Sequence, residues 1–409
     1  MTASIALEPV VSASAEIPSA RRAARGRIPE LDGLRGTAIF FVILWHYFYF
    51  FPATDHHPQG TLRSLYISFE RCIALGWSGV DLFFVLSGFL IGGILLEAKR
   101  SPSYFKTFYM RRFFRIIPIY YLWILCYVAW RALSEPVLLK AASGPENPGS
   151  WGQIFAHFFF VQNLGFIAYS GVAGAWFLST WSLAVEEQFY LIAPLVVRYV
   201  SGRKFVTLLT AVVLLAPVFR ICIHSYYHAA TNLDPAYILM PGRADALAIG
   251  MLAALSWRNG AFRGWLSDHA VILYLLFWLL LSGVVLLARY APDQHSLSME
   301  SFGYTWIAFF YVSVLLLALS RPAGPLASLT RMGWLRGLGA VSYCMYLIHQ
   351  AVNLLFRALL LPSAPGNGSW KILVAPVFAA VATYGLAWIS WRYFEGPLLQ
   401  QGYKFKYWA

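Results

Sequence analysis

The stretch AVILYLLFWLLLSGVVLLA, residues 270–288, holds no charged side chain and is long enough to cross the hydrocarbon of a bilayer as a helix. The rest of the chain has the same character. Of its 409 residues, 59% are hydrophobic and only 12% are charged, whereas soluble domains carry about 25% charged residues. The missing polar surface must face lipid. Because a lipid-exposed backbone has to satisfy its own hydrogen bonds, we predict an all-α fold, a polytopic helical bundle in the membrane.

Apolar stretches of similar length recur between short polar loops, which predicts about ten transmembrane helices. Residues 1–28 are rich in Ala, Ser and Arg, without an apolar run of the signal-peptide type, and are expected to be a disordered basic tail. Residues 29–397 are expected to form the membrane domain and residues 398–409 a cytoplasmic C-terminal tail. The predicted spans are at about residues 37–51, 77–96, 113–133, 181–197, 205–223, 237–256, 270–289, 303–319, 338–361 and 371–391.

The distribution of Lys and Arg decides the orientation, and with it the status of one further apolar segment, residues 151–169. With ten spans and both termini in the cytoplasm, 22 of the 31 Lys and Arg residues lie on the inner side and 9 on the outer side. If residues 151–169 also crossed, the split would be 16 to 15. Only the first split obeys the positive-inside rule. We therefore expect residues 151–169 to be re-entrant or to lie along the outer interface.

Charge and cysteine usage argue against two other kinds of site. The net charge of +13 does not indicate nucleic-acid binding, because an excess of Lys and Arg in a membrane protein usually sets its topology. The four cysteines are far apart and form no C-x-x-C pair, so neither a zinc site nor a disulfide framework is expected. We expect membrane lipids around the protein and no metal in it.

Several titratable residues are predicted to lie at one level in the outer half of the membrane. Such side chains are costly in hydrocarbon unless they are paired or line a wet cavity, so each is a candidate functional residue. Structural alternatives stay open: Asp81 and Arg243 could form an ion pair, and His46 could be a hydrogen-bonded core histidine. The group comprises His46, Asp81, Glu186, Glu187, Arg243 and Asp245.

A second group of charges lies at the cytoplasmic start of the third span, where Arg111, Arg112 and Arg115 fall on about one helical turn. Arg35, at the inner end of the first span, completes this group. Guanidinium groups bind phosphate oxygens in a bidentate manner, which favours a site for a polyanionic cytosolic cofactor. The alternative is a stop-transfer cluster that contacts lipid headgroups.

Seven sequence blocks occur in order between about residues 29 and 397. They are LDGLRG (31–36) followed by His46, DLFFVLSGFL (81–90), RRFFRIIPIY (111–120), WSLAVEEQFY (181–190), RADALAIG (243–250), SYCMYLIH (342–349) and FEGP (394–397). Each block alone is a weak signal, but together they resemble the membrane acyltransferase-3 family of O-acyltransferases.

The resemblance implies a multi-pass enzyme of the bacterial inner membrane. Such an enzyme moves an acyl group, usually acetyl from acetyl-CoA, to a hydroxyl of a glycan, glycolipid or small molecule. Many members of the family carry a C-terminal extracytoplasmic SGNH domain. The sequence up to Ala409 contains none, so we expect no relay through such a domain in the same chain.

The resemblance and the predicted topology together suggest roles for individual residues. His46 is the expected general base or acyl acceptor, because a hydroxyl is a poor nucleophile and imidazole ionises near neutral pH. Glu186 is expected to orient His46, and Asp81 is placed in the same catalytic group. The expected ligands of the CoA phosphates are Arg111, Arg112, Arg115 and Arg35. For two substrate-binding candidates an alternative stays open: either Arg243 or a backbone amide could stabilise the oxyanion, and His349 could line the cavity or only pack between helices. The expected substrate-binding residues are Arg243, Asp245, Glu187, Trp181 and His349.

A different class of protein stays open as the alternative, namely a polytopic transporter or flippase that uses the buried ionisable residues as a relay. Two features argue against it. The sequence has no internal repeat of the kind that marks many transporters, and a relay gives no account of the inner arginine group.

Overall fold

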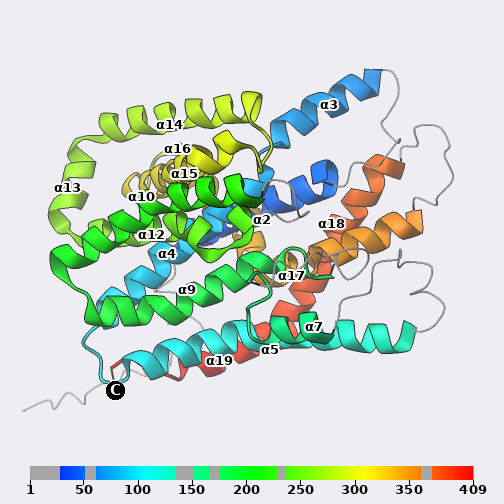
Figure 1. The fold of residues 1–409 in the computed structure, drawn as a ribbon, viewed down its shortest axis with the longest axis horizontal. Helices are drawn as coiled ribbons and strands as arrows, with labels where there is room; N and C mark the ends of the chain where they lie inside the picture. The colour runs from blue at the N-terminus through cyan, green and yellow to red at the C-terminus, as the bar shows by residue number, and fades with distance from the viewer. Residues whose placement is uncertain are drawn as a thin grey trace, which may run out of the picture.

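The computed structural model describes residues 28–50, 61–134, 151–164, 176–227, 235–360 and 371–408, and every regular element in these ranges is helical (Figure 1). The all-α prediction is confirmed. Each of the ten predicted spans coincides with a helix. These helices are α2 (Pro29–Trp45), α4 (Gly79–Ala98), α5 (Tyr104–Ser134), α9 (Thr180–Tyr199), α10 (Gly202–Tyr227), α12 (Met240–Arg258), α14 (Ala270–Tyr290), α15 (Tyr304–Ser320), α17 (Gly333–Leu360) and α18 (Lys371–Ser390).

Shorter elements connect or extend these helices. Three π-helical segments, η1 (His46–Phe50), η3 (Met299–Gly303) and η4 (Trp391–Glu395), continue α2, lead into α15 and continue α18, respectively. The remaining elements are α3 (Thr61–Ile73), η2 (Gly76–Ser78), α7 (Trp151–Phe158), α11 (Pro235–Ile238), α13 (Gly260–Asp268), α16 (Pro325–Thr330) and α19 (Gly396–Tyr403).

Within the described ranges, eight helical segments are long and apolar enough to cross a membrane. They include all the predicted spans except those in α2 and α9. The protein is therefore a multi-pass membrane protein. The number of crossings and the cytoplasmic location of both termini stay predictions.

The segment 151–169 does not form a long helix in its described part. Helix α7 has eight residues, which at 1.5 Å per residue is about 12 Å against a hydrocarbon thickness of about 30 Å. It lies beside α5 (Figure 1), where the Tyr121 hydroxyl donates a hydrogen bond to the Phe158 carbonyl at 2.7 Å. Residues 165–175 lie outside the described residues, so the choice between a re-entrant and an interfacial segment stays a prediction.

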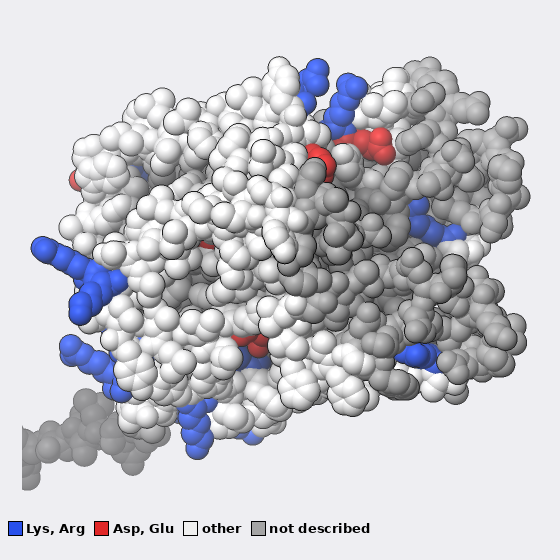
Figure 2. Space-filling view, viewed as in Figure 1, with Lys and Arg blue, Asp and Glu red and all other residues white. Residues whose placement is uncertain are grey.

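Helix α14 shows how the surface is adapted to lipid. It buries only Leu273, Leu280 and Leu287, which recur every seven residues and form one stripe against the bundle. Most of its other large apolar side chains, among them Val271 and Leu275, are exposed. In Figure 2 most of the visible described surface is likewise uncharged, and several Lys and Arg side chains project from the left end, where α9 turns into α10 in Figure 1.

Two glycines set the distance between α4 and α12 at the centre of the bundle. A Cβ added to Gly88 would lie 2.1 Å from the carbonyl oxygen of Leu247, and one added to Gly250 would lie 2.3 Å from that of Val85. No larger side chain fits there without moving a helix, as expected where small residues let membrane helices approach closely. This close crossing places the charges of α4 and α12 within reach of each other.

Candidate active site

A basic vestibule opens between α2, α4, α5, α12, α13 and α19. Among the residues that the structure describes, two carboxylates line it, Asp32 and Glu97, and each forms an ion pair, with Arg35 at 2.9 Å and with Arg258 at 2.5 Å. Six guanidinium groups line the same space, which leaves an excess of four positive charges and makes the vestibule suited to a polyanion. They belong to Arg35, Arg111, Arg112, Arg115, Arg258 and Arg263.

A second, smaller cavity continues the vestibule toward the middle of the bundle. The two spaces share Arg35, Arg112 and Arg115 as lining residues, together with two apolar side chains of α4. Polar groups from α4, α9 and α17 form part of the wall of the second cavity. It contains the hydroxyls of Ser87, Ser182, Tyr190, Ser342 and Tyr346 and the carboxylate of Glu186.

Glu186 is held inside this cavity by hydroxyl groups. The carboxylate accepts hydrogen bonds from Ser87 on α4 and from Tyr190, one turn along α9. The guanidinium of Arg112 lies over the Tyr190 ring, 5.4 Å from its centroid, and links the arginine group to this cluster. Glu187 does not line the cavity, and its Oε1 is buried without a hydrogen-bond partner in the described part of the chain.

His46 occupies the first position of the π-helical segment η1, directly after α2. Single π-helical turns are rare and frequently occur at functional sites. The Nδ1–H of His46 donates to the carbonyl oxygen of Val42 at 2.8 Å. With the proton on Nδ1, the neutral imidazole carries its basic lone pair on Nε2. A backbone carbonyl therefore orients this histidine.

His349 on α17 is the neighbour of His46. The two ring centroids are 4.7 Å apart at an interplanar angle of 71°. Nδ1 of His349 donates to the Tyr346 carbonyl at 2.6 Å, and its Nε2 is buried with no hydrogen-bond partner among the residues described. The ring of Tyr346, which lines the cavity, lies 5.6 Å from that of His349. Tyr346 and His349 thus stand between the cavity and His46.

Helix α17 holds the π-helical segment in place. Asn353 donates to the carbonyl of His46 at 3.5 Å, and Arg357 donates to the carbonyl of Tyr47 at 2.7 Å. In return, the Tyr47 hydroxyl donates to the carbonyl of His349 at 2.8 Å. The relative height of the two histidines is therefore set by reciprocal hydrogen bonds.

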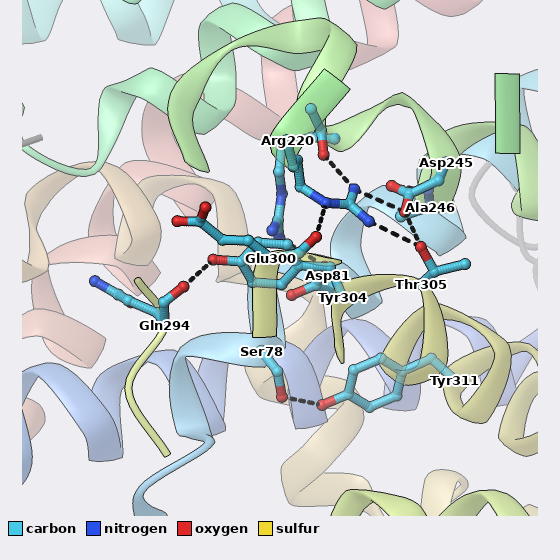
Figure 3. Close-up of polar contacts among 12 residues, drawn as sticks. Ser78, Asp81, Arg220, Asp245, Ala246, Gln294, Glu300, Tyr304, Thr305 and Tyr311 are labelled. Carbon is cyan, nitrogen blue, oxygen red and sulfur yellow. Dashed lines mark hydrogen bonds and ion pairs between the residues drawn. The ribbon is translucent and has the colours of Figure 1, made fainter. Parts of the chain in front are cut away.

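A buried polar network lies apart from the cavity, between α10, α12, η3 and α15 (Figure 3). Arg220 pairs with Asp245 at 2.9 Å and donates to the carbonyl of Glu300. Thr305 donates to the same Asp245 oxygen at 2.6 Å, and His224 contacts the carboxylate of Glu300 at 2.9 Å. Buried charges are tolerated only when paired in this way.

Asp81 and Arg243 form a second buried pair, with an N–O distance of 2.6 Å. The Arg243 guanidinium also lies over four aromatic rings, of which Tyr304 is nearest, 4.1 Å from the guanidinium carbon to the ring centroid. Trp181 belongs to this aromatic cage and packs on Tyr237 with centroids 4.6 Å apart. The pair lies at the α4–α12 crossing and does not line either cavity described above.

The predicted residues therefore fall into three places. Arg35, Arg112, Arg115 and Glu186 line the inner cavity, and Arg111 lines the vestibule. His46 and His349 form a pair behind Tyr346, and Glu186 makes its hydrogen bonds to Ser87 and Tyr190 and none to His46. Asp245 belongs to the buried Arg220 network, and Asp81, Arg243 and Trp181 belong to the second buried pair and its aromatic cage.

Sequence reasoning missed several members of these clusters. Arg220 and Glu300 could have been predicted as members of a buried ion-pair network, since a charge in or beside an otherwise apolar span needs a partner. Ser87 and Tyr346 carried none, because hydroxyls are common packing residues in membrane helices. Among the described residues, no group of three or more His, Cys, Asp or Glu side chains could hold a metal ion.

Comparison with known proteins adds a family to this geometry. The acyltransferase domain of the acyltransferase-3 family matches residues 28–392. The chain belongs to this family. It is 28% identical over 406 residues to the peptidoglycan O-acetyltransferase OatA of Listeria monocytogenes, an alignment that covers 93% of this chain and 57% of the relative. It is 24% identical over 393 residues to the O-acetyltransferase OatA of Staphylococcus aureus, with coverages of 92% and 58%.

The chain thus spans less than three fifths of the length of the curated relatives it matches. No solved structure matches it. Six of the seven motifs that suggested the family lie within the matched range, and FEGP (394–397) begins two residues beyond its end. The predicted membership is confirmed.

Proposed function

We propose that the protein is an O-acetyltransferase of the bacterial inner membrane that transfers acetyl from cytosolic acetyl-CoA to a hydroxyl of a cell-envelope glycan. One observation carries the proposal: a vestibule lined by six guanidinium and two carboxylate groups continues into a partly polar cavity inside the bundle. An acyl-CoA has the matching shape, with a polyanionic nucleotide at one end and a thin uncharged arm at the other.

The arginines shared by the two cavities mark the place of the donor phosphates. Arg35, Arg112 and Arg115 line both spaces, and guanidinium forks suit phosphate oxygens. Arg35 and His46 lie on one helix, 11 residues apart, which is about 16 Å along its axis. A donor anchored at Arg35 would therefore extend its arm along α2 toward the histidine pair.

His46 is proposed as the general base. Its Nε2 takes the proton of the acceptor hydroxyl while the hydroxyl oxygen attacks the thioester carbonyl carbon. The C–S bond then breaks, and the CoA thiolate takes the proton back from the imidazolium, which leaves an ester and free CoA. The geometry requires the Tyr346 ring to move, because this ring and His349 separate the cavity from His46.

The acceptor is proposed from the relatives. The protein from Listeria monocytogenes is named for peptidoglycan, so a glycan hydroxyl on the outer side of the membrane is the acceptor class to test. Catalysis in this chain alone would place the acceptor close to the outer half of α2 and α17. A transporter is not favoured, because the family matched over residues 28–392 is an acyltransferase family.

The test is transfer by the purified full chain in detergent, with acetyl-CoA labelled in the acetyl group and isolated peptidoglycan as the acceptor. We expect label on the glycan that mild base releases as acetate. The variant His46→Ala should lose at least 100-fold in rate, the usual contribution of a general base. The matched control is His269→Ala, because His269 is exposed and lies on no cavity wall.

Two results would contradict the proposal. Transfer by His46→Ala at more than half the rate of the control would remove His46 from the chemistry. Transport of intact labelled donor into vesicles by wild-type protein, without cleavage of the thioester, would favour the transporter class.

A further inference from the structure

The end of the chain is bound to the start of α5. Helix α19 lies beside α5 (Figure 1), and the residues that follow it continue along the same helix. Thr107 and Ser103 donate to the carbonyl of Lys406 at 2.9 and 2.8 Å, and Ser103 and Ser101 donate to the carbonyl of Tyr407. These hydroxyls fix the backbone of a segment that was predicted only as a tail.

The same segment holds Arg111. Nε of Arg111 donates to the Phe405 carbonyl at 2.9 Å, and the guanidinium carbon lies 5.1 Å from the ring centroid of Tyr407 and 5.9 Å from that of Tyr403. The ring of Phe405 stacks on Phe114 of α5, with centroids 6.2 Å apart. Within the described part of the chain, the two Nη nitrogens of Arg111 make no hydrogen bond and no ion pair.

The segment is also part of the vestibule wall. Gly402, Tyr403 and Tyr407 line the vestibule together with Arg111. A Cβ on Gly402 would lie 3.2 Å from Cβ of Phe114, so the segment sits close against α5. An arginine held through Nε and two rings loses little further side-chain freedom when its Nη groups bind a ligand, and such preorganisation improves affinity.

We propose that residues 402–407 are a positioning element of the donor site. They hold Arg111 at the vestibule wall so that its Nη groups bind phosphate of a nucleotide-bearing donor, and Tyr407 is the positioning residue whose ring supports the guanidinium. This inference rests on the proposed function, because it takes the vestibule to be the site of the CoA nucleotide. Arg111 contacts the ligand, whereas Tyr407 acts through Arg111.

The test measures CoA binding to the purified full chain in detergent. Tyr407→Leu keeps the bulk of the side chain but removes the ring face under the Arg111 guanidinium. We expect it to weaken CoA binding about tenfold, the usual value of a cation–π contact in a partly dry site. Tyr407→Phe keeps the ring, and the Tyr407 hydroxyl makes no hydrogen bond in the described residues, so this variant should bind like wild type. Trp408→Leu is the matched control, because Trp408 is 58% exposed and lies on no vestibule wall.

Three further measurements separate positioning from a loss of fold. The KM for acetyl-CoA should rise in Tyr407→Leu while kcat stays within twofold of the control. Adding Tyr407→Leu to Arg111→Ala should weaken CoA binding by less than a further twofold relative to Arg111→Ala alone, because the two side chains act through one contact. Pantetheine, which has no nucleotide or phosphate, should bind equally to Tyr407→Leu and to Trp408→Leu.

The CoA-binding results distinguish a failure of this inference from a failure of the proposed function. Equal CoA affinity in Tyr407→Leu and Trp408→Leu would overturn the positioning role while leaving CoA as the donor. A tenfold loss that persists unchanged in the Arg111→Ala background would also overturn it, since Tyr407 would then act independently of Arg111. Wild-type protein that binds no CoA would overturn the proposed donor and this inference with it.

Discussion

The buried pair of Asp81 and Arg243 gives the sharpest prediction about stability. Asp81 is the only hydrogen-bonding partner of Arg243 among the described residues, and Nε and Nη1 of Arg243 are buried without any. Replacing Asp81 by Leu leaves a buried cation held only by aromatic rings. Breaking a buried pair in this way costs about 3–5 kcal/mol.

The double variant Asp81→Leu/Arg243→Met removes both charges and keeps the volume of the site. Apolar replacements of buried ion pairs are often neutral or stabilising. Here the replacement also loses the ring contacts of the guanidinium, the nearest of them at 4.1 Å, which are worth about 2 kcal/mol when desolvated. We therefore expect the double variant to cost no more than about 2 kcal/mol, less than Asp81→Leu alone.

The assay is the free energy of unfolding of the detergent-solubilised protein, from an SDS titration followed by tryptophan fluorescence. Asp268→Ala is the control, because Asp268 is exposed and such a change is usually within about 0.5 kcal/mol. The reasoning is refuted if Asp81→Leu costs less than about 1 kcal/mol, or if the double variant costs the sum of the two single ones. Acetyl transfer by the double variant distinguishes a structural from a chemical role of the pair. Retained activity means that Asp81 and Arg243 are structural. Activity lost from a stable double variant means that Asp81 or Arg243 acts in the chemistry.

Three other predictions follow from the cavities, the helix crossing and the topology. Arg112→Ala should raise the KM for acetyl-CoA by about 10-fold or more, since a charged hydrogen bond contributes about 1.5–3 kcal/mol, and should leave the KM for the acceptor nearly unchanged; an equal rise in both would count against a donor site. Gly88→Ala should lower the yield of folded protein, because its Cβ would lie 2.1 Å from a backbone oxygen, whereas Gly260→Ala, with nothing within 4 Å, should be tolerated; equal yields would show that α4 and α12 separate easily. With membrane-impermeant thiol reagents on intact cells, Ser328→Cys should stay unlabelled and Lys140→Cys, outside the described residues, should be labelled; the opposite pattern would reverse the proposed orientation.

The helices were predictable from sequence because each depends on local information. A run such as residues 270–288 must be helical wherever it lies in the bilayer, since its backbone has no other hydrogen-bond partners. The arginine group was predictable for a related reason, since Arg111, Arg112 and Arg115 share one turn of α5 and reach one vestibule together. Boundaries were less accurate, and α5 begins at Tyr104, nine residues before the predicted span.

The partners of the functional side chains were not predictable from depth alone. His46 and Glu186 were expected to meet because both were predicted to lie at one depth in the outer half of the membrane, yet Glu186 bonds to Ser87 and His46 packs on His349. Depth fixes the height of a side chain but not the direction in which it points around the helix. That direction depends on which helix faces are adjacent.

By itself, the sequence determined an all-helical membrane bundle and membership of an acyltransferase family, because hydropathy and motif order are properties of the chain taken locally. Only the tertiary structure decided which charges pair, which of them line a cavity, and that the chain end holds Arg111. These depend on how closely helices approach, as at Gly88, and on how each is rotated about its axis. Both follow from packing between residues far apart in the chain, which no local pattern records.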